Sequence, residues 1–252
     1  MEMDKDLLFF KDLENEKLNL FVDTMIKQAK VKFIPFNFED LTSTPEYKKY
    51  GKDYRSYWDV IANEYLAFGS NTIKQHISGK STYRKILIDV CKNMKVNFNE
   101  KQTTLKIEDS LLQRVLEDVW EKMSDEEKET FLGEVNELYG TKNYNAIGTN
   151  ALIWIFKSGG FSSYKLLLII VNAIYKSILG KGLSLAANRT ITKGVSVLVG
   201  PIGTILSGVW LAYDFAGPAY RVTVPCTVLI AAFRQIEKYE EKYPELESGK
   251  EA

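Results

Sequence analysis

Apolar residues recur at helical spacing along most of the first 140 residues. In the stretch 15–28, for example, Leu18, Val22 and Met25 fall on one stripe, which is typical of an amphipathic helix packed on a core. The same reading predicts a series of helices over residues 4–10, 15–28, 53–69, 71–77, 81–95, 107–123 and 124–138. We therefore expect the first half of the chain to be an all-helical bundle.

Residues that favour helix ends support several of these boundaries. Asn15 and Ser81 are suitable N-caps, and Gly69 is a suitable C-terminal glycine. Ser124 and Glu127 have the spacing of a capping box, in which the serine oxygen and the glutamate each bond a free backbone amide.

One segment of the first half breaks the helical pattern. Residues 31–52 contain an alternating aromatic run, together with Pro35 and Pro45, which exclude a helix interior at their positions. We expect this segment to be extended or irregular, as a lid, a linker or an edge strand.

The chain changes in character after residue 140. A polar, turn-rich stretch at 141–150 predicts a domain boundary, and apolar helices are expected at 151–156, 162–179, 183–199 and 201–216. Pro218 would end that series, and a last helix should run from about Pro225, with an inner stripe of Leu229, Phe233 and Ile236. The predicted division is residues 1–140, with a short module at 4–28 and an irregular segment at 29–52, and residues 141–252.

Charge is distributed very unevenly along the chain, although the formal net charge is zero. Residues 1–145 carry 22 basic and 26 acidic side chains, residues 146–234 carry eight and one, and residues 235–252 carry three and six. The stretch 146–234 is therefore both basic and apolar. Such a stretch favours an anionic or apolar partner.

Small residues recur every fourth position within that stretch. Together with Gly203, they form the predicted helix-packing, membrane or partner contact: Gly200, Gly203, Thr204, Gly208, Ala212 and Ala216. Small residues at this spacing let a second backbone approach closely, in a membrane or in a tightly packed soluble core. The uncharged run 194–213 just reaches the length of a membrane span, whereas the run 166–175 is too short. Spanning, peripheral attachment and a buried soluble helix all remain open.

A charge pair flanks the turn at Gly217 and Pro218. Asp214 and Arg221 could bridge across this turn and fix the direction of the last helix, because an unpaired charge in apolar surroundings is costly. Tyr220 and Arg221 could instead contact a ligand.

The residue types that catalysis requires are scarce. No phosphate-binding loop or zinc spacing occurs, and His76 is the single histidine, which suits a surface position better than a catalytic base. Carboxylates on the first-half helices could form a paired site, but their spacing does not distinguish such a site from solvent-facing charge; they are Glu64, Asp89, Glu117 and Glu121. Cys91 and Cys226 are expected to be buried, reduced thiols. We predict no catalytic residue, metal or cofactor.

Several segments resemble a known family. WDVIANEYLAFGSNTI at 58–73, YRKILIDVCKNMKV at 83–96, LLQRVLEDVWEKM at 111–123 and GPAYRVTVP at 217–225 are similar to the YaaW-like family of uncharacterised bacterial proteins, and residues 4–23 resemble a module found in front of it. The middle helices also resemble the ubiquinol-cytochrome c chaperone domain. The resemblance implies an all-α fold, and it suggests a role in assembly without naming any chemistry.

The sequence therefore predicts a non-enzymatic, all-α protein of the cytoplasm, in which a helical bundle precedes a Gly-rich apolar region. We expect it to bind a protein partner or an anionic membrane surface, peripherally on the inner face of the cytoplasmic membrane, and not nucleic acid. The alternatives are a small-molecule or lipid-binding helical protein and a carboxylate-dependent hydrolase. The sequence does not predict the oligomeric state.

Overall fold

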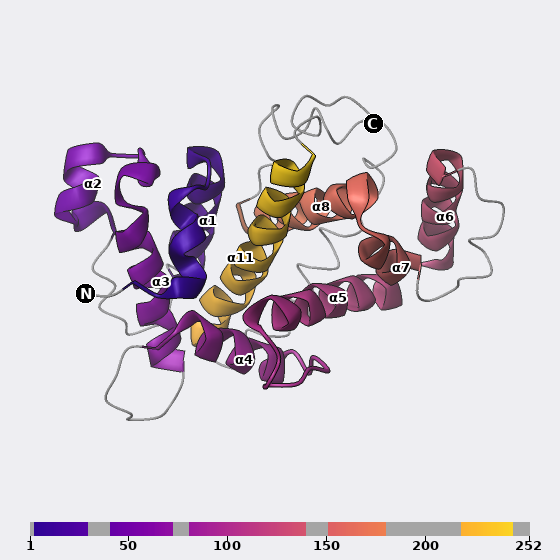
Figure 1. Cartoon of the computed structure of the whole chain (residues 1–252), viewed down its shortest axis with the longest axis horizontal. Helices are drawn as coiled ribbons and strands as arrows, with labels where there is room; N and C mark the ends of the chain where they lie inside the picture. Colours follow the sequence, from indigo (N-terminus) through magenta and orange to yellow (C-terminus); the bar gives the residue numbers. More distant parts are fainter. Residues whose placement is uncertain (1–2, 30–40, 73–80, 140–150, 180–217, 244–252) are drawn as a thin grey trace. The chain divides into compact units, whose positions relative to one another are not determined.

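The computed structural model describes residues 3–29, 41–72, 81–139, 151–179 and 218–243. Every regular element within these ranges is a helix, as the hydrophobic pattern predicts (Figure 1). The α-helices are α1 (Asn15–Ala29), α2 (Pro45–Tyr50), α3 (Trp58–Thr72), α4 (Tyr83–Asn93), α5 (Thr104–Lys122), α6 (Asp125–Tyr139), α7 (Ala151–Ser158), α8 (Gly160–Leu179) and α11 (Pro218–Lys242). Short 3-10 helices occupy η1 (Lys5–Lys11), η2 (Leu41–Ser43) and η3 (Tyr54–Tyr57).

The chain divides into two compact units. The first takes its described residues from Met1–Ser110 and Trp210–Ala231, and the second from Leu111–Val209 and Ala232–Ala252. Helices α5 and α11 therefore contribute residues to both units. The predicted domain boundary at residues 140 and 141 lies outside the described residues, so it stays a prediction.

The first unit has a core rich in aromatic rings. Phe10 packs edge-on against Phe21, with ring centroids 5.2 Å apart, and Phe21 packs in the same way against Tyr65 at 5.7 Å. These contacts join η1, α1 and α3. Edge-to-face aromatic pairs each add about 0.5–1.5 kcal/mol beyond the area that they bury.

Gly69 lies inside α3, so the prediction that it ends this helix is wrong. A Cβ atom at this position would lie 2.1 Å from Cδ1 and 2.2 Å from Cγ1 of Ile86, a buried residue of α4. Glycine suits this position because the buried Ile86 side chain occupies the space that a Cβ atom would take. A tertiary contact therefore overrides the low helix propensity of glycine.

Two other helix starts differ from their predictions. The side chain of Asn15 does not cap α1: its Nδ2 donates to the Lys52 carbonyl at 3.0 Å, and its Oδ1 accepts from the Arg55 amide at 3.3 Å, which ties α1 to η3. The cap of α4 is Thr82 and not Ser81, since the Thr82 hydroxyl accepts from the Lys85 amide at 3.4 Å.

Proline positions account for the remaining differences. Pro45 is the first residue of α2, where its missing amide is harmless, and Thr44 caps this helix, so residues 31–52 are not irregular throughout. Helix α11 begins at Pro218 and not near Pro225, which lies inside it, and the predicted end of the preceding helix before Pro218 lies outside the described residues. The predicted stripe of Leu229, Phe233 and Ile236 is buried as expected.

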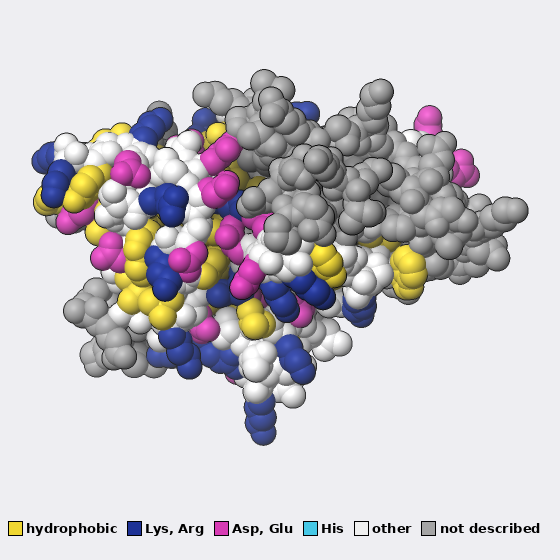
Figure 2. Space-filling view, turned by 45° about the horizontal axis from the view of Figure 1, so that its top comes forward, with side chains coloured by type: hydrophobic (Ala, Val, Ile, Leu, Met, Phe, Trp, Pro, Cys, Tyr) yellow, Lys and Arg dark blue, Asp and Glu magenta, His cyan; other side chains and the backbone are white. Residues whose placement is uncertain are grey.

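The second unit confirms the capping box at the start of α6. The Ser124 amide donates to Glu127 Oε2 at 2.8 Å, and the Glu127 amide donates to Ser124 Oγ at 3.2 Å. On the face shown in Figure 2, basic, acidic and apolar side chains of the described residues are interspersed.

Candidate functional site

Residues 151–179 of the basic, apolar stretch form a helical hairpin, α7 followed by α8, in the second unit, and residues 218–234 belong to α11. The local sequence of the hairpin explains its turn. Gly159 and Gly160 have φ values of +72° and +67°, a left-handed backbone that glycine adopts without steric cost. The Ser163 hydroxyl donates to the Phe156 carbonyl at 2.7 Å, which satisfies a backbone group at the end of α7.

Helix α7 buries most of its apolar residues and exposes one large ring. Four apolar side chains are at most 7% exposed, namely Leu152, Ile153, Ile155 and Phe156, whereas Trp154 is 45% exposed. Lys157 and Ser158, at the end of the same helix, are also exposed. An indole ring and an ammonium group therefore lie together at the solvent side of the hairpin.

Helix α8 is buried along most of its length, including polar positions. Residues 163–174 are all buried, and this run includes Lys165 at 7% exposure and Asn172 at 5%. Tyr164 donates to Glu240 of α11 at 2.8 Å, and this bond lies within the second unit. The apolar surface of the predicted 166–175 run therefore packs inside the protein.

The hairpin is uniformly basic. Residues 151–179 contain Lys157, Lys165 and Lys176 and no Asp or Glu, and both Lys157 and Lys176 are exposed. Within the described ranges, no helix combines the length and the apolar character that crossing a membrane requires.

The predicted contact ridge cannot be placed. Gly200, Gly203, Thr204, Gly208, Ala212 and Ala216 lie outside the described residues, and so do the whole 194–213 run and His76. These predictions remain predictions.

The charge pair at the turn is only partly described. Asp214 lies outside the described residues, so its bridge to Arg221 stays a prediction. Tyr220 is a hydrogen-bond partner of Asp89, which ties α11 to α4 within the first unit. Burial raises the pKa of Tyr220 to about 12, and this hydrogen bond adds to the shift. Tyr220 therefore has a structural partner.

The first-half carboxylates differ in environment. Glu117 and Glu121 are exposed on α5, as solvent-facing charges would be, and Glu64 is partly buried on α3. Burial raises the pKa of Asp89, while the hydrogen bond from Tyr220 opposes that shift. Within the described residues, no group of three or more His, Cys, Asp or Glu side chains has the arrangement of a metal site.

A buried polar network in the first unit was missed by the sequence reading. The Tyr83 hydroxyl donates to Glu108 Oε1 at 2.6 Å, and both residues are at most 1% exposed. The Tyr65 hydroxyl shares a hydrogen bond with Thr227 Oγ1 at 2.7 Å, and the rings of Tyr65 and Tyr83 are 6.4 Å apart. The one available signal was Glu108, a carboxylate next to the predicted apolar position Ile107.

Both cysteines belong to the same buried region, which confirms their predicted burial. Burial raises the pKa of the Cys91 thiol to about 12, and the nearby Glu108 carboxylate adds to this shift. Burial also raises the pKa of Cys226. Both groups therefore stay protonated thiols, without the thiolate that nucleophilic or redox chemistry requires.

These features describe an all-α protein with a polar-centred helical unit and a basic, apolar helical hairpin. Comparison with known proteins supplies the family. The chain is 42% identical to a UPF0174 protein of Helicobacter pylori strain J99 over 235 residues, which cover 92% of this chain and 91% of the relative. It is 31% identical to the UPF0174 protein YaaW of Escherichia coli K12 over 245 residues, 92% of this chain and 94% of the relative.

The chain therefore belongs to the UPF0174 family, as its resemblance to YaaW-like proteins implied. A second Helicobacter pylori member, from strain 26695, is 39% identical over 204 residues and is covered over 96% of its length. No family model and no solved structure matches the chain, so its resemblance to the ubiquinol-cytochrome c chaperone domain stays a prediction.

Proposed function

We propose that this protein is a non-enzymatic, peripheral membrane binder that attaches to an anionic lipid surface through the α7–α8 hairpin. The observation that carries the proposal is Trp154, which is 45% exposed at the centre of a short helix whose other large apolar residues are buried. Tryptophan favours the membrane–water interface, because its ring is apolar and its N–H still finds a polar partner there.

Charge supports an anionic surface over a neutral one. Lys157 is exposed three residues after Trp154, and residues 151–179 contain no Asp or Glu that would repel lipid phosphates. Each basic side chain near an anionic surface contributes about 1 kcal/mol of attraction. Trp154 and the exposed lysines would act together, because stable attachment usually needs an apolar and an electrostatic contribution.

Peripheral attachment fits the hairpin better than insertion. Residues 163–174 of α8 are already buried, so their apolar surface is not available to lipid without unfolding part of the unit. Trp154 and Lys157 are at the surface in the folded protein. The proposal therefore requires no rearrangement of the hairpin.

Vesicle co-flotation tests the proposal with two pairs of matched variants. The full-length protein should float with vesicles of phosphatidylglycerol and phosphatidylcholine, and much less with phosphatidylcholine alone. Lys157→Glu should weaken binding about tenfold, because it replaces attraction by repulsion, whereas Lys48→Glu, an exposed lysine of the first unit, should change it little.

The apolar contribution has its own control. Trp154→Ala should weaken flotation, whereas Leu105→Ala, which trims another exposed apolar residue, should not. Absence of flotation with the anionic vesicles would overturn the proposal. If the target and control variants lose flotation equally, binding depends on the overall charge or hydrophobicity of the protein and not on this site. That result would also contradict the proposal.

A further inference from the structure

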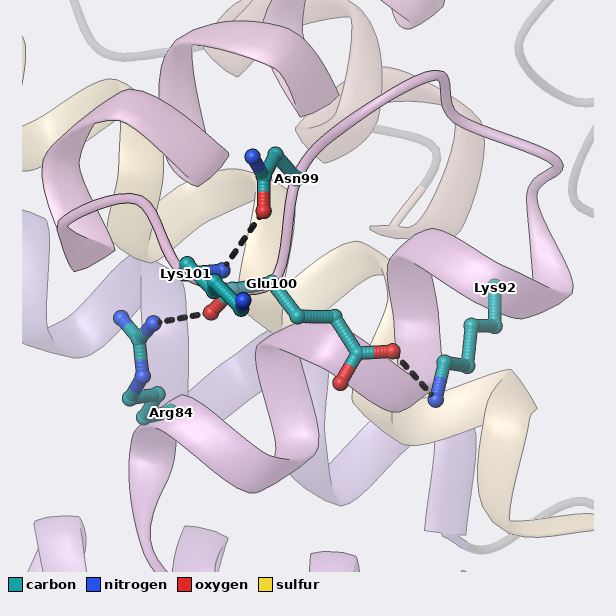
Figure 3. Close-up of polar contacts among 5 residues, drawn as sticks. All are labelled: Arg84, Lys92, Asn99, Glu100 and Lys101. Carbon is teal, nitrogen blue, oxygen red and sulfur yellow. Dashed lines mark hydrogen bonds and ion pairs between the residues drawn. The ribbon is translucent and has the colours of Figure 1, made fainter.

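Side-chain hydrogen bonds hold the loop between α4 and α5. Residues 94–103 contain no glycine or proline. The Arg84 guanidinium donates to the carbonyl oxygens of Glu100 at 2.7 Å and Gln102 at 2.6 Å, and to the Thr104 hydroxyl at 3.2 Å. Lys92 forms an ion pair with Glu100 at 2.8 Å (Figure 3). Arg84 thus fixes the loop along its whole second half.

The same loop begins with a strained lysine. Lys95 has a φ of 54°, the left-handed conformation that usually belongs to glycine or asparagine at the end of a helix. The Val96 amide donates to the Cys91 carbonyl at 2.9 Å, which completes the helix end. Lysine therefore occupies a position where glycine would adopt the backbone conformation with less strain.

Lysines with no partner among the described residues surround this loop. Lys95, Lys101 and Lys106 are exposed, and none of their side chains forms an ion pair within the described ranges. The two carboxylates between Arg84 and Lys106 are already engaged, Asp89 with Tyr220 and Glu100 with Lys92.

Two leucines are exposed on η1 and α5, the elements that the Thr104–Asp6 hydrogen bond joins. Leu105 is 52% exposed between Lys101 and Lys106, and Leu8 of η1 is 43% exposed. The Thr104 hydroxyl donates to Asp6 Oδ2 at 3.0 Å, which fixes η1 beside the start of α5. We call the surface formed by Lys95, Lys101, Lys106, Leu105 and Leu8 the loop face.

We infer that the loop face is a docking site for an acidic, leucine-bearing segment of a partner protein. Its lysines are complementary to carboxylates, and its exposed leucines are complementary to apolar side chains placed between them. The loop is fixed before binding, so little conformational entropy is lost when a partner docks. This inference concerns the first unit and goes beyond the proposed lipid contact of the second.

The loop face is less suited to other anionic partners. Single-stranded nucleic acid needs exposed rings on which bases stack, and the exposed apolar residues of the loop face are leucines. The loop face also lacks an exposed tryptophan or tyrosine, the residues that favour a lipid interface. A protein segment can contact both the lysines and the leucines of the loop face.

Fluorescence anisotropy with a labelled, helical Glu/Leu peptide of about 14 residues tests the inference. The full-length protein should bind this peptide more tightly than a version in which alanine replaces leucine, and more tightly than an oligothymidylate of similar charge. The double variant Lys101→Glu/Lys106→Glu should weaken binding about tenfold. The charge-matched double variant Lys48→Glu/Lys52→Glu should not.

Lys95→Gly separates binding from folding. It should raise the melting temperature, because glycine adopts the left-handed backbone without strain, and it should weaken peptide binding, because it removes a cation. Unchanged peptide affinity in both loop-face variants would overturn the inference, as would tighter binding of the oligonucleotide. Loss of vesicle flotation in Lys157→Glu with peptide binding intact would separate the two sites.

Discussion

The two units of this protein are built on different chemistry. The first packs aromatic rings around paired polar groups, with Glu108 buried against Tyr83 and Tyr65 bonded to Thr227. The described α7–α8 hairpin of the second packs mostly aliphatic residues, with Ser163, Lys165 and Asn172 buried among them, and has Trp154 at its surface. Buried polar groups stabilise a fold only while each keeps its partner. We therefore expect the first unit to be specific and sensitive to substitution, and the hairpin to be more tolerant and available for binding.

Alkaline pH should cause the largest difference in stability between the two units, because it destabilises the first. Burial raises the pKa of Tyr54 to about 12 and raises those of Tyr57 and Tyr65 above their ordinary value, and all three belong to the first unit. The folded state therefore favours neutral tyrosine. The resulting stability is present below about pH 10 and is lost as the pH rises through about 12.

A tyrosine absorbance titration, followed in parallel by circular dichroism, checks this expectation. Ionisation of the buried tyrosines should coincide with loss of helical signal. Reversible ionisation near pH 10 of all 14 tyrosines, with the helices intact, would contradict it.

Tyr83→Phe should destabilise the first unit strongly. It removes the hydroxyl that donates to Glu108, a carboxylate that is 1% exposed. The expected loss is about 2–3 kcal/mol in the free energy of unfolding, because a buried carboxyl group loses a hydrogen-bond donor. Chemical denaturation measures it, with Tyr50→Phe, a 38% exposed tyrosine, as the control.

Gly69→Ala should cost about 2 kcal/mol, because its Cβ would overlap the buried Ile86 side chain. Gly133→Ala in α6 of the second unit is a matched control. No atom lies within 4 Å of its Cβ position, and this substitution should be stabilising by up to about 1 kcal/mol, the helix-propensity gain. Similar changes in stability from both alanines would refute the close approach of α3 and α4.

Ser163→Ala should have the smallest effect, about 1 kcal/mol, because it leaves the Phe156 carbonyl without its hydroxyl donor at the end of α7. A loss as large as that of Tyr83→Phe, measured by the same denaturation, would mean that the hairpin also depends on specific polar contacts.

Local sequence signals predicted much of the fold. Periodicity predicted most of the longer helices near their observed bounds but missed α2 and the start of α11, and the Ser124–Glu127 spacing predicted a capping box that forms as expected. These features depend on residues at most a few positions apart. They need no knowledge of how distant segments pack.

The errors arose where distant segments meet. Glycine is typical of a helix end, but Gly69 lies inside α3, where the Ile86 side chain occupies the space of a Cβ atom. The partner of Glu108 is Tyr83, 25 residues earlier, and no local pattern indicates such a bond. Trp154 lay within a predicted apolar helix, and periodicity alone could not distinguish the exposed ring from its buried neighbours.

The most direct test of the membrane proposal places an environment-sensitive NBD label on the hairpin. Cys91 and Cys226 are fully buried, so Ser158→Cys and, as a control, Lys48→Cys should each be labelled selectively. Anionic vesicles should increase and blue-shift the fluorescence at residue 158 and leave that at residue 48 unchanged. If the NBD spectrum at residue 158 does not change when anionic vesicles are added, the proposed role of the α7–α8 hairpin is contradicted, whether or not the protein binds the vesicles elsewhere.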